Sequence, residues 1–270
     1  MPELPEVETT CRGITPHLLN QTIDSVILRR DKLRWDINKN LSIILQNQQV
    51  KDISRRAKYI LIQFETGTLI IHLGMSGSLR WLNTDTPPEK HDHVDFVFAQ
   101  YCLRYRDPRR FGAILWTEQP VLEHALLNNL GVEPLSDQFT GDYLYQQSRQ
   151  RKIAIKTLIM DSHTLVGVGN IYACESLFKA GIHPSRPAED ISLKRYMVLT
   201  NYIKQILTQA IQQGGTTLKD FSSSDGKPGY FQQCLHVYAR TDLACPKCST
   251  PIKKMKQAQR STFYCGKCQT

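Results

Sequence analysis

The pattern of apolar and polar positions divides the chain into a first helix, a strand-rich half and a helical half. Apolar residues recur at helical spacing from Val7 to Leu18, which predicts a helix that begins within a turn of Glu3. Short β-branched runs follow and predict an antiparallel sandwich or flattened barrel, with a hairpin turn at Thr66-Gly67. The predicted strands are Ile23–Leu28, Ile43–Leu45, Tyr59–Phe64, Thr68–Leu73, Val94–Phe98 and Ala113–Trp116.

Helical spacing returns at about residue 130, after which the pattern predicts an all-helical segment. Its longest helix carries apolar residues from Tyr196 to Ala210 and is expected to stop at Gly214-Gly215, a common C-terminal signal. Residues 131–150 are the predicted connection between the halves. A polar stretch from Gly214 to Tyr230 has no periodicity, and it is either a mobile functional loop or a tolerated insertion. The predicted fold class is therefore α+β, with more than one domain.

Composition and charge narrow the class of partner. With 270 residues the chain has room for one large or two modest domains, and it lacks both an apolar run long enough to span a bilayer and a secretion signal. We therefore expect a cytoplasmic protein. From Arg240 onward, seven Lys or Arg residues and one acidic residue, Asp242, contribute +6 of the formal net charge of +9. This basic end favours nucleic acid over an anionic membrane, because no basic amphipathic helix accompanies it.

Four of the eight cysteines form two close pairs near the C-terminus. The pattern Cys245-x2-Cys248-x16-Cys265-x2-Cys268 predicts a structural zinc site, with a disulfide-stapled tail as the alternative. The insert between the pairs carries Lys253, Lys254, Lys256 and Arg260, so the zinc would hold a basic hairpin suited to nucleic acid. The remaining cysteines, predicted to be reduced and buried, are Cys11, Cys102, Cys174 and Cys234.

The first residues are a candidate nucleophile. Removal of Met1 would leave the secondary amine of Pro2 as the first group of the chain, with Glu3 beside it. Such an amine is far more often unprotonated at neutral pH than a lysine, and addition to an aldehyde carbon would give a cationic iminium that acts as an electron sink. The alternative is that Pro2 and Pro5 only stiffen the entrance to the first helix.

Two further sets of residues are typical of phosphate or DNA contacts. The segment Gly167-Val-Gly169-Asn170 opens a helix, where Asn170 could cap the helix and free N–H groups could bind an anion, although a plain glycine turn is the alternative. The strand-rich half contains a set of candidates, each of which could equally be a solvated charge or a core residue. A Met, an Arg and a Phe near strand ends are also residue types used as wedges in DNA. These candidates are Arg55, Arg56, Lys58, His72 to Met75, His91, His93 and Arg109-Arg110-Phe111.

Taken together, these segments resemble bacterial formamidopyrimidine-DNA glycosylases along the whole chain and in the expected order. The resemblance is carried by Pro2–Glu8, Arg56–Tyr59, His72–Gly77, Asp107–Gly112, Gly167–Tyr172 and the four-cysteine tail. It implies an N-terminal catalytic β-sandwich domain with an N-terminal helix (1–130), a helix-two-turn-helix domain (131–236) and a zinc finger (237–270). A loop at about 216–230 would cover a flipped base.

The resemblance also implies an activity and its partners. Such a protein excises oxidised purines, such as 8-oxoguanine and formamidopyrimidines, and cleaves the abasic strand by β,δ-elimination. It would act as a monomer on double-stranded DNA that contains an oxidised purine or an abasic site, away from membranes. It would hold one structural Zn²⁺ and need no redox or nucleotide cofactor.

Residue roles follow from the same resemblance. Pro2 would attack C1′, Glu3 would act as acid or base in opening the sugar ring, Lys58 would be the proton donor of β-elimination and Arg260 would serve δ-elimination. The implied DNA-binding residues are His72, His91, Arg109, Arg151 and Asn170, and Asn170 and Lys58 would hold phosphates. Met75, Arg109 and Phe111 would fill the gap left by the everted nucleotide.

Two rival interpretations remain open. An enzyme of the endonuclease VIII type shares the proline chemistry but prefers oxidised pyrimidines; the start Glu-Leu-Pro-Glu and the spacing Arg109-x-Phe111 favour the purine branch. A non-catalytic zinc-ribbon protein that binds DNA would explain the tail and the charge, but it would leave Pro2, Glu3 and Lys58 without a role.

Overall fold

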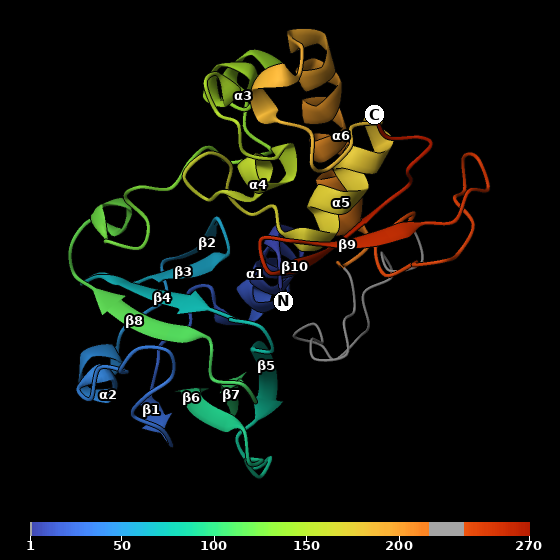
Figure 1. The fold of residues 1–270 in the computed structure, drawn as a ribbon. Coiled ribbons are helices and arrows are strands. Elements are labelled where there is room, and N and C mark those ends of the chain that lie inside the picture. The colour runs from blue at the N-terminus through green and yellow to red at the C-terminus, as the bar shows by residue number, and fades with distance from the viewer. Residues whose placement is uncertain (1, 216–234) are drawn as a thin grey trace. The chain divides into compact units, whose positions relative to one another are not determined.

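The computed structural model describes residues 2–215 and 235–270, which form two compact units (Figure 1). The first comprises residues 2–128 with 213–215, and the second comprises residues 129–212 with 235–270. Cys234 and the loop predicted at 216–230 lie outside the described residues.

The first unit consists of one long helix and two antiparallel four-stranded sheets. Helix α1 spans Leu4–Leu18, as the apolar spacing predicts. One sheet has the strand order β1-β6-β7-β5, and the other has the order β2-β3-β4-β8 (Figure 1). The bounds are β1 Ser25–Leu28, β2 Asp52–Arg56, β3 Tyr59–Gln63, β4 Thr68–His72, β5 Ser78–Asn83, β6 Asp92–Phe98, β7 Tyr101–Arg106 and β8 Ala113–Thr117. The short helix α2 Leu41–Leu45 lies between β1 and β2, and η1 Val121–Glu123 follows β8.

The core of this unit is one cluster to which α1 and both sheets contribute. Ile14 and Leu18 of α1 are buried in the same cluster as Ile60 of β3, Ile71 of β4 and Phe96 of β6. Because the helix packs on β2, β3 and β5, its N-terminal end is fixed relative to both sheets. The predicted hairpin at Thr66-Gly67 is confirmed, since β3 and β4 pair across it.

Strand β6 is buried on both faces, whereas the alternation of its apolar residues alone predicts burial on one face only. Asp95 lies on the face opposite Phe96 yet is only 2% exposed. Arg104, directly opposite on β7, donates to both of its carboxylate oxygens at 2.8 Å. These hydrogen bonds lower the pKa of Asp95 although burial raises it, so the pair stays ionised inside the sheet.

One predicted strand is wrong and three strands escape prediction. The run Ile43–Leu45 belongs to α2, in which Leu41 and Leu45 are buried one helical turn apart while Ile43 is 75% exposed. Strands β2, β5 and β7 carry arginines or other polar residues in place of a clear apolar alternation. These three strands form because they hydrogen-bond to apolar neighbouring strands, and the pattern of a single sequence does not record such pairing.

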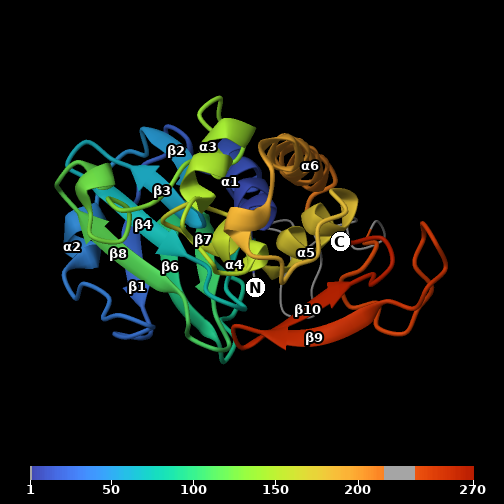
Figure 2. The same cartoon turned by 45° about the horizontal axis from the view of Figure 1, so that its top comes forward.

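The second unit is helical and ends in a two-stranded hairpin (Figure 2). Its longest helix ends just before Gly214 and Gly215, which have φ of 75° and 80°, as the sequence predicts. Phe178 of α5 shares an apolar cluster with Val237, Ile252 and Phe263, so the hairpin region packs on that helix. The bounds are α3 Gly141–Ser148, α4 Ile155–Met160, α5 Asn170–Lys179, η2 Ala188–Asp190, α6 Leu193–Gln212, β9 Lys253–Gln257 and β10 Arg260–Tyr264.

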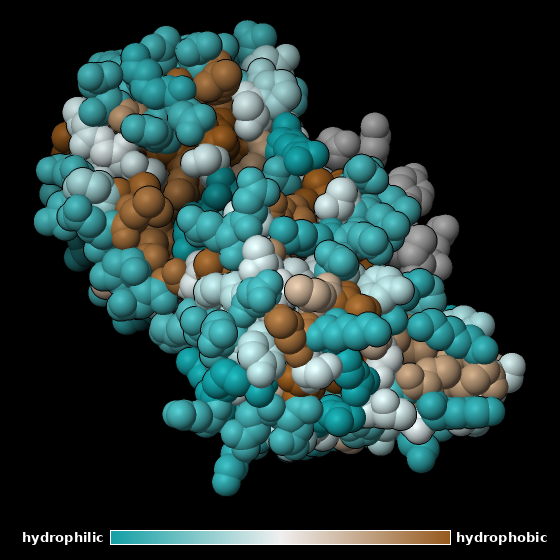
Figure 3. All heavy atoms as spheres, turned by 90° about the horizontal axis from the view of Figure 1, so that it is seen from above, coloured by the Kyte–Doolittle hydropathy of each residue, from teal (hydrophilic) through white to brown (hydrophobic). Residues whose placement is uncertain are grey.

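On the face shown in Figure 3, hydrophilic side chains dominate and hydrophobic ones form small groups between them. Among the described helices, none combines the length and the apolar character needed to cross a bilayer.

Candidate active site

The N-terminal residues are buried and held in one place. Pro2 is buried, and Glu3, the N-cap of α1, is 2% exposed. The backbone N–H of Glu3 donates to Oε2 of Glu6 at 2.8 Å, which fixes the chain directly ahead of the helix. Gly215, with φ of 80°, lies beside the same carboxylate, since a Cβ there would come within 3.1 Å of Glu6 Oε1. A nucleophile at position 2 would therefore have a fixed position.

Lys58 lies in the two-residue turn that joins β2 and β3. Its neighbour Ala57 is buried with φ of 54°, a left-handed conformation that costs energy for a residue with a side chain. Arg55 secures the turn, because it donates to the carbonyl of Ala57 at 2.7 Å and to Glu8 Oε2 of α1 at 3.0 Å. The structure thus ties the turn that carries Lys58 to the helix that follows Pro2 and Glu3.

His72 ends β4 opposite Tyr59, with ring centroids 4.9 Å apart. The backbone N–H of Gly74 donates to its Nδ1 at 3.0 Å, so this nitrogen carries no proton. Burial, with smaller contributions from the charges of Lys58 and Arg34, lowers the pKa of His72 to about 4. At neutral pH the ring is uncharged and can offer an N–H at Nε2 to an external acceptor.

The depressed pKa of His72 predicts a pH-dependent stability. The unfolded chain takes up a proton near pH 6.5, whereas the folded chain does so only near pH 4. Unfolding is therefore favoured as the pH falls between these values, by up to about 1.4 kcal/mol per pH unit. An NMR titration should show the ring of His72 neutral down to about pH 4, and His72→Asn should remove this part of the stability slope. A ring that titrates near its ordinary pKa would contradict the assignment.

Asp107 organises the loop that carries Arg109 and Phe111. Its side chain is fully buried and accepts from Ser76 Oγ and from the backbone N–H of Gly112, both at 2.9 Å. The guanidinium of Arg109 lies over the ring of Phe111 at 5.4 Å, and Phe111 is 48% exposed. The 107–112 loop therefore presents an arginine and a phenylalanine together at the surface.

Met75 lies on the neighbouring loop. Gly74, with φ of 62°, packs so closely on the 107–112 loop that a Cβ there would lie 2.5 Å from the backbone of Phe111 and Gly112. Ser76 binds Asp107, so both neighbours of Met75 are attached to the same loop. The structure brings together the predicted wedge residues Met75, Arg109 and Phe111, which are far apart in the sequence.

Replacement of Asp107 should destabilise the first unit. Asp107→Ala would leave buried N–H and O–H donors without an acceptor, and we expect a loss of about 3 kcal/mol in the free energy of unfolding. The exposed Asp85 provides a charge-matched control, for which the change should stay within about 0.5 kcal/mol. Denaturant unfolding measures both variants, and an Asp107→Ala protein as stable as the wild type would refute this role.

His91 adjoins the same loop through its backbone. Its carbonyl accepts from the N–H of Asp107 at 3.1 Å, and its side chain is partly exposed. His93 is buried and donates from Nε2 to the carbonyl of Asp107 at 2.8 Å. Burial lowers the pKa of His93, so this histidine supports the loop as a neutral residue. It is therefore a core residue, the alternative that the sequence left open for each of these candidates.

In the second unit, a buried lysine connects Asn170 to the hairpin. Lys156 of α4 is 2% exposed and donates to Asn170 Oδ1 at 2.5 Å and to Thr262 Oγ1 of β10 at 2.6 Å. Asn170 in turn donates to the carbonyl of Ser261 at 2.8 Å. The expected capping role of Asn170 is wrong, because Gly169 is the N-cap and the Asn170 side chain binds the hairpin instead.

A pocket of about 340 Å³ lies between α4 and the hairpin turn, and one of the predicted residues, Arg260, lines it. Lys156, which donates to Asn170, and Asp161 also line it, although the sequence did not point to either residue. Arg151 lies 3.8 Å from Asp161 Oδ2 and donates to Thr164 at 3.3 Å. Ala258 and Gln259 at the hairpin tip both have positive φ, which turns the chain sharply just before Arg260.

Sequence reasoning missed Lys156, Asp107 and the supporting role of Glu6. Lys156 stands between the buried apolar residues Ile155 and Leu158 of α4. A lysine within such an apolar helical segment is unusual, and it could have indicated a buried charge with a specific partner. The partners of Asp107 include Ser76 from another loop, and no local pattern indicates such a contact.

The four terminal cysteines converge on one point. Their sulfur atoms all lie within 4.8 Å of one another, with Cys245 Sγ to Cys268 Sγ at 3.9 Å and Cys248 Sγ to Cys265 Sγ at 3.5 Å. Tetrahedral zinc with Zn–S bonds of about 2.3 Å requires sulfur atoms about 3.8 Å apart, so the donor set fits this ion. Cys11, Cys102 and Cys174 are buried outside this cluster, as predicted.

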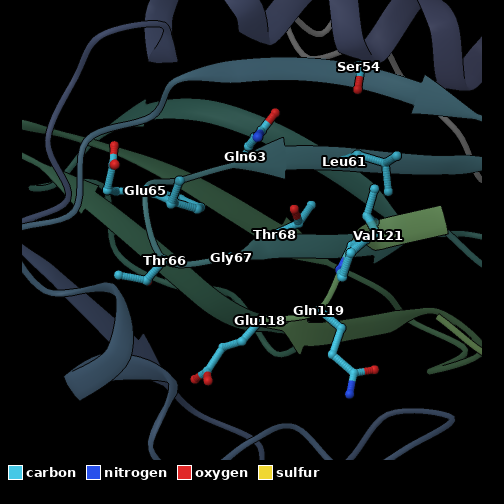
Figure 4. A pocket seen from close by; sticks show the side chains of 12 residues that line it. Ser54, Leu61, Gln63, Glu65, Thr66, Gly67, Thr68, Glu118, Gln119 and Val121 are labelled. Carbon is cyan, nitrogen blue, oxygen red and sulfur yellow. The ribbon is translucent and has the colours of Figure 1, made fainter. Parts of the chain in front are cut away.

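Another pocket, of about 300 Å³, lies beside the β3–β4 turn and contains none of the predicted site residues (Figure 4). Glu65 and Glu118 are among its lining side chains, and no lysine or arginine lines it. This excess of negative charge makes the pocket unsuitable for a polyanion.

Three family models match successive parts of the chain. Residues 1–114 match the formamidopyrimidine-DNA glycosylase N-terminal domain, and residues 130–222 match the H2TH domain of the same enzyme. Residues 243–270 match the zinc finger found in FPG and IleRS.

Relatives and solved structures agree with these models over the full length. The formamidopyrimidine-DNA glycosylase of Psychromonas ingrahamii is 56% identical over 270 residues and that of Ruthia magnifica 57% over 271 residues, each covering 100% of both chains. The MutM (FPG) protein of Thermus thermophilus has a TM-score of 0.89 at 35% identity and covers 99% of this chain and 98% of its own. A Lactococcus lactis FPG variant in complex with Fapy-dG-containing DNA has a TM-score of 0.91 at 33% identity, covering 99% of both chains. This chain belongs to the formamidopyrimidine-DNA glycosylase family.

Proposed function

We propose that this protein is a base-excision repair enzyme that removes oxidised purines from duplex DNA and then cleaves the abasic strand by β,δ-elimination. Relatives over the whole length carry the glycosylase name, and solved relatives are complexes with DNA that contains Fapy-dG or an abasic site. In this chain, the main support for the proposal is the buried N-terminal segment, which the hydrogen bond between Glu3 and Glu6 fixes directly ahead of α1.

The reaction begins at the Pro2 amine once Met1 has been removed. The nitrogen attacks C1′ of the damaged nucleoside, and the bond from C1′ to the base breaks with its electron pair leaving on the base. Glu3 exchanges the proton needed to open the sugar ring at O4′, and the product is an iminium between C1′ and Pro2. Its positive charge draws electrons from C2′, which prepares the strand for cleavage.

Strand cleavage follows as two eliminations from the same iminium. A base takes the C2′ proton, a double bond forms between C2′ and C3′, and the bond from C3′ to its phosphate oxygen breaks, with Lys58 donating a proton to the departing oxygen. Loss of the C4′ proton then breaks the bond from C5′ to its phosphate oxygen in the second elimination, to which Arg260 is assigned. The ion pair between Arg55 and Glu8 supports the assignment of Lys58, because it attaches the turn of Lys58 to the helix behind Pro2. The positive pocket around Arg260 and Lys156 supports a phosphate contact there.

The remaining predicted residues divide into phosphate contacts and wedges. His72, His91, Arg109, Arg151 and Asn170 are proposed to bind DNA, and the clustering of Met75 with Phe111 supports their proposed role as wedges. Everting a nucleotide costs a few kcal/mol, which such wedges and phosphate contacts offset. The contacts to phosphate carry no sequence information, which suits a protein that searches for damage.

The four cysteines hold one structural zinc ion, in agreement with the zinc-finger model that matches this region. Thiolates are available for all four coordination positions, so the ion would stabilise the hairpin and leave the chemistry to other groups. We propose domain boundaries at 1–130, 131–236 and 237–270, a monomer in the cytoplasm, and a lesion-covering role for residues 216–230.

The choice of substrate is tested by comparing excision from two duplexes. One contains 8-oxoguanine opposite cytosine, and the other contains thymine glycol. We expect faster release of the purine lesion; strong preference for thymine glycol would instead assign the chain to oxidised pyrimidines.

A further inference from the structure

The segment between β1 and α2 holds one arginine rigidly at the surface. Leu33 and Ile37 are buried in the core of the first unit, 6% and 2% exposed. The N–H of Ile37 donates to the carbonyl of Asp31 at 2.8 Å, which closes the segment into a compact loop. Arg34, next to Leu33, is exposed. Its position is therefore fixed by core packing although its side chain reaches solvent.

Arg34 lies at the edge of the 107–112 loop. Its backbone N–H donates to the carbonyl of Gly112 at 3.1 Å, directly after the proposed wedge Phe111. Burial has the largest effect on two neighbouring groups: it lowers the pKa of His72 and raises the pKa of Tyr59. The positive charge of Arg34 makes a smaller contribution that lowers the pKa of both groups. The guanidinium thus belongs to the positive environment around Lys58 and His72.

The side chain of Arg34 is preorganised for an external anion. Its guanidinium carbon lies 4.5 Å from the centre of the Trp35 ring, a stacking arrangement that limits its freedom. Within residues 2–215 and 235–270, no carboxylate forms an ion pair with it, whereas Arg29, Arg55, Arg80 and Arg104 are each paired with Asp or Glu. A stacked guanidinium that keeps its N–H donors available is well suited to bind phosphate.

We propose that Arg34, supported by Trp35, binds a backbone phosphate of the DNA beside the nucleotide gap filled by the 107–112 loop. The proposal rests on the proposed function, since it needs DNA as the substrate. It adds a contact from a segment that none of the recognised motifs contains, and it gives the first unit a cation close to its wedge residues.

The salt dependence of DNA binding tests this contact. A protein releases about 0.9 counterions for each phosphate that it neutralises on duplex DNA. In fluorescence anisotropy with a duplex that holds a tetrahydrofuran abasic analogue, Arg34→Ala should reduce the slope of log Kd against log salt by about 0.9. The affinity at low salt should fall about tenfold, as expected for one charge-assisted hydrogen bond. Arg34→Lys, which keeps the charge, should recover the slope.

Lys51 provides the matched control. It is exposed, lies at the end of the β2–β3 hairpin opposite the turn of Lys58, and loses the same charge in Lys51→Ala. This variant should keep the wild-type slope. Arg34→Gln, which keeps the stem that stacks on Trp35, serves as a second test in case Arg34→Ala unfolds.

The outcomes separate the two proposals. Wild-type binding with an unchanged slope in Arg34→Ala and Arg34→Gln would overturn the contact and leave the proposed function intact. An equal loss of slope in Lys51→Ala would also overturn the Arg34 contact, because the effect would then come from the net charge of the protein and not from this position. A wild-type protein that does not bind the duplex at all would overturn the proposed function and this contact with it.

Discussion

We expect a chain whose N-terminal proline amine is blocked to form almost no covalent adduct with an abasic duplex under borohydride. The blocked form can be made with residues added ahead of Pro2, because the proline nitrogen then becomes a tertiary amide without a nucleophilic lone pair. We expect trapping to fall by about a thousandfold or more, as it does when an enzyme loses its nucleophile. Gel electrophoresis of the trapped complex measures the effect.

Two controls make this result specific. The blocked chain should still bind a tetrahydrofuran duplex, although added residues displace a segment that is buried in the structure, so binding shows whether the fold survives. Lys58→Ala should keep the borohydride adduct, because Lys58 is assigned to a later proton transfer. Wild-type trapping by a blocked chain that binds DNA would exclude Pro2 as the nucleophile.

Removal of the zinc should abolish tight DNA binding while the first unit stays folded. Structural zinc contributes about 10–16 kcal/mol of binding free energy to small zinc domains, far more than the hairpin β9–β10 could supply alone. Without it the hairpin loses the geometry that places Arg260 and that connects Thr262 to Lys156 and Asn170. We expect Cys265→Ser to lower the affinity for an abasic duplex by about a hundredfold or more, a loss of several charge-assisted contacts.

The free cysteines supply the control for this experiment. Cys102 is buried in β7, outside the metal cluster, and Cys102→Ser should leave both the zinc content and the affinity close to wild type. Metal analysis should find about one zinc per chain in both the wild type and this variant. Active protein with almost no zinc would overturn the structural site.

Local sequence signals predicted the parts of the fold that local physics determines. The helix after Glu3 has apolar spacing and an N-terminal proline, the hairpin at Thr66-Gly67 has turn residues, and the cysteine pairs have the spacing of a metal site. Each feature is stabilised mainly by neighbours in the sequence or by one ion, so its pattern is visible without the fold.

The missed features depend on partners far away in the sequence. Asp95 is buried on β6 only because Arg104 lies opposite on β7, and Asn170 turns away from its expected cap because Lys156 and Ser261 bind it. The short helix α2 reads as a strand because its apolar run is brief and only the burial of Leu41 and Leu45 distinguishes the two. Long-range contacts decide these cases, and single-sequence periodicity contains no record of them.

The candidate site shows the same division. Pro2 and Glu3 could be proposed from their chemistry, and the resemblance supplied roles for Lys58 and Arg260. The supports of that site, Asp107 beneath the 107–112 loop and Lys156 between α4 and the hairpin, became visible only in three dimensions.

The most direct test of the account is to identify the residue that carries the trapped DNA. The wild-type chain is reacted with a duplex containing 8-oxoguanine in the presence of borohydride, digested with a protease and a nuclease, and analysed by tandem mass spectrometry. We expect a reduced sugar fragment on the nitrogen of Pro2, on chains that have lost Met1. A fragment attached to Lys58 or to any other lysine, with Pro2 unmodified, would contradict it.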